Sequence, residues 1–268
     1  MKTVDGTRSN LYAGSQFKHK RYEVRLTENA REILEAQRLR YEVFAGELGA
    51  KLESGRLGLD RDRYDHFVKH LIVRDTHQRK IIGYTRILTR DMANIVGGFY
   101  SSNEFDLTRI MSLQGNIIEI GRTCIHRDHR RGGTISLLWS GIARVMEAYR
   151  ADYLIGCASI PMGENGETPQ TILGSLDRSH LSSEMYRVYP KTPVPFKRDL
   201  QPTSSSVEIP PLIKGYLRAG AKICGEPCWD REFNVADVFI CLDREQIDKR
   251  YQKRFVPGNE SEVLRKAS

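Results

Sequence analysis

Residues 117–159 read IIEIGRTCIHRDHRRGGTISLLWSGIARVMEAYRADYLIGCAS and contain the clearest structural pattern in the chain. The apolar runs Ile117–Ile125 and Tyr153–Ser159 predict two buried strands. Between them, apolar residues recur at helical spacing and form one wholly apolar face: Ile135, Leu138, Trp139, Ile142, Val145, Met146 and Tyr149. The segment therefore predicts strand, loop, amphipathic helix and strand, an order typical of α/β folds.

The loop before this helix is basic and rich in glycine. Its residues are Arg127, Arg130, Arg131, Gly132, Gly133 and Thr134. Unpaired backbone N–H groups and the helix dipole both favour an anion at a helix N-terminus. The loop is therefore a candidate phosphate site, and a solvated basic turn is the alternative.

The same order of strand, Arg-x-x-Gly loop, helix and strand resembles the acyl-donor motif of the Gcn5-related N-acyltransferases. The resemblance implies an α/β fold with a mixed central sheet flanked by helices. It also implies that the loop binds the pyrophosphate or phosphopantetheine of the donor, and that the backbone at Thr123 or Cys124 holds the thioester oxygen. The sixth motif position, usually Gly or Ala, is Ile135 here, so the motif leaves open whether coenzyme A is the donor.

Other residues indicate which group of acyltransferases the chain resembles. Arg40 to Phe44, Asp62, Asp65, Arg86, and Glu119 with Arg122 follow the order and approximate spacing of acyl-homoserine-lactone synthases. Longer segments are more similar to the hemolysin-like acyltransferases, especially the ornithine-lipid synthases: LRYEVFAGELGA, YDHFVKHLIVRD, GFYSSNEFDLTRI, EIGRTCIHRDHRRGGTISLLW and IKGYLRAGAKICGEPCWDREFNVADVFICL. The resemblance extends from about residue 22 to 256.

This resemblance implies an enzyme that moves a (3-hydroxy) fatty acyl group from acyl carrier protein to the α-amino group of ornithine, forming lyso-ornithine lipid. It implies no cofactor beyond the phosphopantetheine of the donor. A signal synthase that makes N-acyl amino acids or acyl-homoserine lactones is the nearest alternative. A non-catalytic basic module that binds nucleic acid or a membrane surface is the alternative from another class.

Amide formation from a thioester requires a neutral amine, a polarised carbonyl and a path for the leaving thiolate. Glu119 is the candidate general base, acting through water, and Arg122 is its catalytic partner; a structural ion pair between the two is the alternative. On a flat strand these residues would point to opposite faces, so a shared site requires a bulge, for which Gly121 is well placed.

The acceptor site should combine arginine and carboxylate side chains, because ornithine has a carboxylate and a second amine. Arg86, Asp62 and Asp65 are the candidates, and a surface salt-bridge set is the alternative. Arg40 and Phe44 share one helix face and are expected to line the site. Cys124 has no evident His partner, which favours direct transfer over an acyl-enzyme.

Net charge and composition indicate which kinds of partner the protein can bind. The chain has 268 residues and a net charge of +8, which favours acidic partners such as acyl carrier protein, and peripheral contact with an anionic membrane surface. No nucleic-acid signature is present, so nucleic acid is not expected. No apolar run approaches the roughly 18 residues of a membrane span, so a cytoplasmic protein is expected, with peripheral contact at the inner face of the membrane.

The odd number of cysteines, five, predicts reduced thiols, and no metal site is expected.

The expected organisation is a flexible basic arm at 1–20, an acyltransferase domain at 21–256 and a flexible tail at 257–268. A proline-containing insertion or lid is expected at about 160–206. Further strands are expected at Tyr22–Leu26, His70–Arg74, Ile81–Leu88 and Asp237–Leu242. Helices are expected from a Thr27 cap to about Phe44, at Pro210–Ala219 and from Arg244 onward, with short helices in the loop 90–112.

Overall fold

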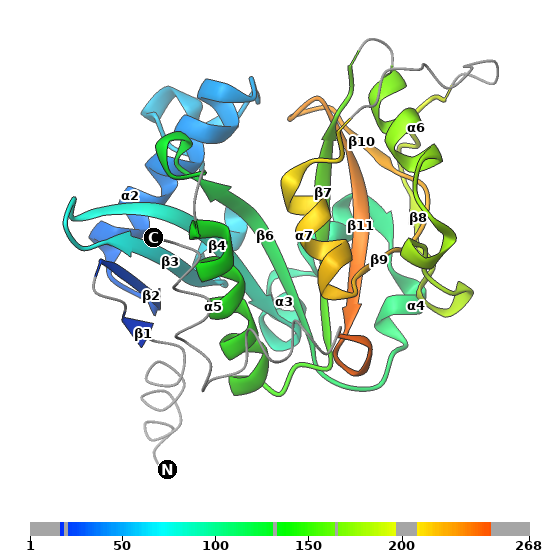
Figure 1. The fold of residues 1–268 in the computed structure, drawn as a ribbon, viewed down its shortest axis with the longest axis horizontal. Coiled ribbons are helices and arrows are strands. Elements are labelled where there is room, and N and C mark those ends of the chain that lie inside the picture. Colours follow the sequence, from blue (N-terminus) through cyan, green and yellow to red (C-terminus); the bar gives the residue numbers. More distant parts are fainter. Residues whose placement is uncertain (1–16, 19–20, 131–132, 164–165, 197–207, 248–268) are drawn as a thin grey trace.

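A computed structural model describes residues 17–18, 21–130, 133–163, 166–196 and 208–247. The predicted tail, most of the predicted arm, Arg131 and Gly132 lie outside the described residues. One mixed sheet dominates the fold, in the order β1-β2-β3-β4-β6-β7-β11-β10, and β9 pairs with β11 (Figure 1). The mixed sheet with flanking helices confirms the predicted α/β class.

The strands follow the apolar runs of the sequence. They are β1 (Phe17–Lys18), β2 (Tyr22–Thr27), β3 (Lys69–Asp75), β4 (Lys80–Thr89), β6 (Ile117–Ile125), β7 (Tyr153–Pro161), β9 (Lys222–Ile223), β10 (Cys228–Asp230) and β11 (Val235–Asp243). A separate pair joins β5 (Phe105–Asp106) to β8 (Tyr189–Pro190). Every pairing in the large sheet is antiparallel except that of β6 with β7. A parallel pair requires a crossover, which α5 (Thr134–Ala148) supplies.

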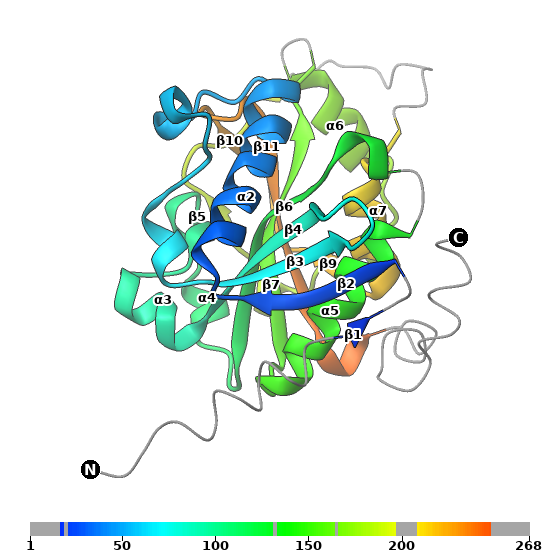
Figure 2. The same cartoon turned by 90° about the vertical axis from the view of Figure 1, so that its left-hand side faces the viewer.

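Helices cover both faces of this sheet. Figure 1 shows α5 and α7 (Pro211–Ala219) on one side, and Figure 2 shows α2 (Ala30–Tyr41) and α3 (Arg90–Val96) on the other. The side chains of β3 alternate accordingly: Leu71 and Val73 join the core under α5, whereas Ile72 joins the core under α2. Because both faces are buried, the central strands are continuous apolar runs.

The first long helix differs from expectation at both ends. Its N-cap is Asn29 rather than Thr27, because Asn29 Oδ1 accepts hydrogen bonds from the backbone N–H groups of Arg31 and Glu32. Its C-terminal end continues as a π-helix, Glu42–Glu47, which carries the predicted Phe44. The helix predicted from Arg244 is also wrong within the described residues, where only a short 3₁₀ turn, Arg244–Gln246, forms.

The segments between the central strands contain short elements. They include α4 (Thr108–Met111), α6 (Glu167–Gly174) and 3₁₀ turns at Glu53–Leu57, Arg63–His66, Tyr100–Asn103, Arg127–His129, Arg178–His180 and Glu184–Tyr186. Ile172 and Val194 of the predicted insertion are buried in the main core. The thiols of all five cysteines are free, and only Cys157 is not fully buried. None of the helices within the described ranges combines the length and apolarity needed to cross a bilayer.

Candidate active site

The candidate site lies where two parallel strands separate. β6 pairs with β7 only from Ile117 to Glu119, and beyond that point the two strands diverge (Figure 1). At the start of this fork the chains approach closely: a Cβ at Gly156 would lie 2.5 Å from the Ile120 carbonyl oxygen, so the position requires glycine. A cavity of about 200 Å³ occupies the fork.

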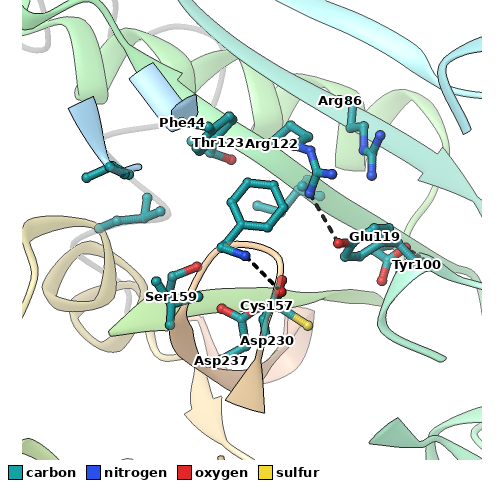
Figure 3. Close-up of a pocket in the computed structure, with 16 residues that line it drawn as sticks. Phe44, Arg86, Tyr100, Glu119, Arg122, Thr123, Cys157, Ser159, Asp230 and Asp237 are labelled. Atoms are coloured by element: carbon teal, nitrogen blue, oxygen red, sulfur yellow. Dashed lines mark hydrogen bonds between the residues drawn. The ribbon is translucent and has the colours of Figure 1, made fainter. Parts of the chain in front are cut away.

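Side chains from both strands and from the flanking segments line this cavity (Figure 3). They are Phe44, Leu48, Arg86, Tyr100, Glu119, Ile120, Gly121, Arg122, Thr123, Cys157, Ser159, Leu212, Asp230, Phe233, Val235 and Asp237. The predicted residues Glu119, Arg122, Thr123, Arg86 and Phe44 are therefore brought together in one cavity, although they come from three separate parts of the sequence.

The predicted bulge forms in β6. Arg86 pairs with Gly121 and Tyr84 pairs with Cys124, so Thr85 alone lies opposite two residues, Arg122 and Thr123. The left-handed residue is Arg122, with φ of 52°, rather than Gly121. This conformation costs an arginine roughly 1–2 kcal/mol, so the contacts of its side chain must hold it in place. The bulge allows Arg122 to share the cavity with Glu119.

Glu119 is buried and held by the turn at Tyr100. Its Oε2 accepts from the Tyr100 backbone N–H at 2.6 Å, and its Oε1 accepts from the Ser101 N–H at 2.8 Å and from the Ser101 hydroxyl. Burial raises the pKa of this carboxyl above its ordinary value, and these hydrogen bonds partly offset the rise. Since each carboxylate oxygen has two lone pairs, Oε2 keeps one for a water or an amine.

Arg122 does not pair with Glu119 anywhere in the described structure. Its Nε lies 3.1 Å from Asp60 Oδ2, and its Nη1 donates to the Tyr100 hydroxyl at 3.2 Å. Its guanidinium also stacks 4.6 Å from the centre of the Phe233 ring. Burial would lower the pKa of Arg122, but the neighbouring hydroxyl and carboxylates raise it overall, so the side chain stays cationic. The alternative of a direct Glu119–Arg122 ion pair is therefore replaced by an Asp60–Arg122 pair.

Arg40 was expected to line the site but is fully buried behind it. Its Nε lies 2.9 Å from Asp60 Oδ2, and its Nη1 lies 2.5 Å from Asp65 Oδ1. Asp60 thus joins Arg40 to Arg122. Arg40 is corrected from a lining residue to one that positions the carboxylate beside Arg122.

The predicted acceptor residues are already paired with one another. Arg86 Nη1 donates to Asp62 Oδ2 at 2.7 Å, and Asp65 is held by Arg40. Asp62 and Asp65 also form a reciprocal capping box on the turn Arg63–His66. Arg86 Nη2 is buried and has no hydrogen-bond partner among the described residues. The two carboxylates therefore orient arginines, and a role in binding the acceptor amine stays a prediction.

The predicted donor-binding residues divide into two groups. Thr123 lines the cavity, whereas the Cys124 side chain is buried under α2, where burial raises the pKa of the thiol to about 12. This inert thiol agrees with direct transfer. At the loop, Gly133 caps α5 and Thr134 is its first residue. Arg127 is exposed, and Arg130 is tied to Glu47 at 2.8 Å.

Several site residues were not chosen from the sequence. Asp60 lies in a charged loop, and Tyr100 and Ser101 lie in a segment noted only for its resemblance. Glu104, Asp230 and Asp237 place their carboxylate oxygens within 4.8 Å of one another, and the last two line the cavity. Isolated acidic residues on separate segments give no signal of this proximity.

Comparison with known proteins supports the assignment of the fold. Residues 39–140 match the family model described as an acetyltransferase (GNAT) domain. The chain is similar in fold, at 10% identity and a TM-score of 0.52, to FeeM, an N-acyl amino acid synthase from uncultured soil microbes, covering 88% of this chain and 96% of that one. It is also similar, at 14% identity and a TM-score of 0.51, to the acyl-homoserine-lactone synthase LasI, covering 88% and 95%.

Sequence comparison gives the family. The chain is 34% identical over 257 residues to the L-ornithine N(alpha)-acyltransferase of Agrobacterium fabrum, covering 90% of this chain and 87% of that protein. It is 32% identical to the L-ornithine N(alpha)-acyltransferase of Rhodobacter capsulatus, covering 87% and 93%. The chain is thus an acyltransferase on the predicted Gcn5-related fold, and it belongs to the L-ornithine N(alpha)-acyltransferase family.

Proposed function

We propose that this protein transfers a fatty acyl group from acyl carrier protein to the α-amino group of ornithine and releases lyso-ornithine lipid. The observation that carries the proposal is the cavity in the β6–β7 fork, where a buried carboxylate faces cationic side chains. The relatives named L-ornithine N(alpha)-acyltransferase support the choice of acceptor.

Glu119 acts as the general base of this reaction. The acceptor amine is largely protonated near neutral pH and must lose a proton before it attacks the thioester carbonyl. A buried carboxyl with a raised pKa is a stronger base than an exposed one, and Glu119 keeps a free lone pair on Oε2. The proton passes from the ammonium group to Glu119 through water, and the thiolate of phosphopantetheine leaves.

The bulge positions the groups that receive the developing negative charge. Arg122 and Arg86 place positive charge on one side of the cavity, and the Thr123–Cys124 backbone is the candidate donor to the thioester oxygen. No covalent acyl-enzyme is needed, since the Cys124 thiol is buried and has a raised pKa. The donor brings its own phosphopantetheine, so the chain requires no resident cofactor.

Acyl carrier protein is the proposed donor because of charge. The net charge of +8 attracts an acidic carrier, and the exposed Arg127 lies next to the loop that precedes α5. The same charge supports peripheral contact with an anionic membrane at its cytoplasmic face. Nucleic-acid binding is not proposed, since the site is a cavity lined by charges of both signs rather than a basic stripe.

The direct test incubates purified protein with radiolabelled ornithine and a 3-hydroxyacyl carrier protein and separates the lipids. We expect a labelled lyso-lipid that requires both substrates. An acyl-homoserine-lactone synthase would instead require S-adenosylmethionine and release a lactone, so a parallel reaction with that substrate separates these two functions. Salt-sensitive duplex binding without any acyl transfer would support the non-catalytic alternative.

A further inference from the structure

The three carboxylates Glu104, Asp230 and Asp237 form a cluster that the catalytic step does not use. Glu104 follows the turn at Tyr100, Asp230 ends β10 and Asp237 lies within β11. One oxygen of each lies within 4.8 Å of one oxygen of each of the others. Glu104 and Asp237 are buried, with exposed fractions of 9% and 4%. Such a cluster is costly unless protons or a cation neutralise it.

Among the described residues, this cluster has no direct cationic partner. In the parts of the chain that the structure describes, no lysine, arginine or histidine forms an ion pair with any of the three. Glu104 Oε2 and Asp237 Oδ1 are buried, and neither has a hydrogen-bond partner within the described ranges. Asp230 is anchored, since its Oδ1 accepts from the backbone N–H groups of Glu232 and Phe233. The cluster is rigid and has unused acceptor positions.

The cluster adjoins the cavity that contains Glu119. Asp230 and Asp237 line the cavity, and Figure 3 shows them across it from Arg122. On the arginine side, Arg86 Nη2 is buried and has no hydrogen-bond partner among the described residues, although the guanidinium packs on the rings of Tyr64 and Tyr100. One side of the cavity therefore has a hydrogen-bond donor available for an anion, and the other side has carboxylate oxygens available for a cation.

We infer that the acceptor is recognised at both ends: the carboxylate cluster binds its side-chain ammonium group, and Arg86 Nη2 binds its α-carboxylate. This inference rests on the proposed function and deepens it by assigning the side chains that recognise the two charged ends of the acceptor. A ligand held at both ends has its α-amine inside the cavity that Glu119 also lines.

The protonation of the empty cluster agrees with this inference. Burial, followed by the charges of Asp237 and Asp230, raises the pKa of Glu104 well above its usual range. Burial raises the pKa of Asp237 to about 6. A bound ammonium group would favour the ionised carboxylates, so the KM for the diamino acid should increase as pH falls through this range.

The test compares ornithine with norvaline, which has the same carbon chain but no terminal amine. We expect the wild-type enzyme to prefer ornithine in kcat/KM by at least about a hundredfold, because a buried polar site rejects a ligand that cannot satisfy it. Asp237→Asn keeps the shape of the protonated acid and should lower this preference at least about tenfold, mainly through a higher KM for ornithine. Asp91→Asn, an exposed carboxylate on α3, is the matched control and should retain the preference.

The contact between Arg86 and the α-carboxylate is tested by comparing ornithine with putrescine. Putrescine is ornithine without its carboxylate, and the wild-type enzyme should prefer ornithine to it. Arg86→Lys retains an ion-pair partner for Asp62 but loses the second guanidinium arm, so the preference over putrescine should fall while the preference over norvaline is kept. Ornithine should also raise the thermal unfolding midpoint of the wild type, and this shift should be lost in Asp237→Asn.

The outcomes separate the two proposals. If Asp237→Asn and Asp230→Asn keep the ornithine preference and the ornithine-induced stabilisation, the cluster does not bind the ammonium group, although the protein is still an ornithine acyltransferase. If a chelator abolishes the preference and Mg²⁺ or Ca²⁺ restores it, the cluster is a metal site and the inference is overturned. If the wild type acylates norvaline as well as ornithine, the proposed acceptor itself is wrong.

Discussion

Replacing Glu119 with glutamine should lower turnover by about 10²- to 10⁴-fold, the usual loss when a general base is removed. This range corresponds to about 2.7–5.4 kcal/mol of activation free energy at 1.36 kcal/mol per tenfold. The amide has nearly the shape of the carboxyl group but cannot accept a proton from the amine. The KM for ornithine should change much less than kcat.

The structure also predicts the effect on stability. Both oxygens of Glu119 accept from backbone N–H groups, so the amide –NH₂ must face a donor at either Tyr100 or Ser101. Losing a hydrogen bond to a charged group costs about 1.5–3 kcal/mol, and removing a buried charge offsets part of this. A domain that is stable by about 5–15 kcal/mol remains folded, so unfolding cannot account for the loss of turnover.

The pH profile separates a base from a structural carboxylate. Because burial raises the pKa of Glu119 above 4.5, turnover should fall as pH decreases through that raised value. For the same reason, the contribution of Glu119 to the free energy of unfolding is largest below 4.5 and decreases as pH rises through the folded-state pKa. Ser101→Ala removes a hydrogen bond that lowers this pKa. The acidic limb of the pH–rate profile, where turnover falls at low pH, should therefore move to higher pH.

These effects are measured by initial rates from pH 5 to 9 with chemical unfolding of the same samples. Glu119→Gln should lose the acidic limb, and Ser101→Ala should shift it with a much smaller decrease in kcat. If Glu119→Gln keeps kcat within about threefold and retains the limb, the carboxylate is structural and another base operates.

Three further predictions concern the framework and the donor. Arg40→Met should destabilise the protein by about 3–5 kcal/mol in urea unfolding, since it removes the close arginine partner of buried Asp65 and leaves buried Asp60 with Arg122 alone; a loss below about 1 kcal/mol would contradict this. Gly156→Ala should cost about 1–3 kcal/mol and lower activity, because its Cβ meets the Ile120 carbonyl oxygen; unchanged thermal stability would argue against the close approach. Arg127→Glu should raise the KM for acyl carrier protein more than that for acyl-coenzyme A, increasingly at low salt; an equal effect of the control Arg31→Glu would show general charge rather than a carrier contact.

Much of the fold can be predicted from the local pattern of apolar residues. β6 was predicted with both ends correct, and α5 was predicted within one residue, because its apolar residues repeat at helical spacing and it connects two apolar runs. The bulge was also predictable, since two polar residues three apart on one strand can share a site only if the pleat is interrupted. The start of α2 was missed because Thr27 and Asn29 are both good caps, and only the backbone geometry selects Asn29.

The remaining parts of the site depend on contacts between distant segments. Asp60 lies between Arg40 and Arg122, which are 20 and 62 residues away along the chain. Asp237 lies beside Glu104 only because β11 pairs with β7 and the turn before β5 packs nearby. No periodicity encodes such proximity, so the sequence supplied the carboxylates and arginines but not their pairing.

The position of the acyl group on the product is the most direct test of the central claim. The wild-type protein would be supplied with a 3-hydroxyacyl carrier protein and ornithine, and the product analysed by tandem mass spectrometry. The α-amine is expected beside Glu119, with the terminal amine at the carboxylate cluster, so we predict an Nα-acyl ornithine with a free terminal amine. A product acylated on the terminal amine, or no amide of ornithine at all, would contradict the account.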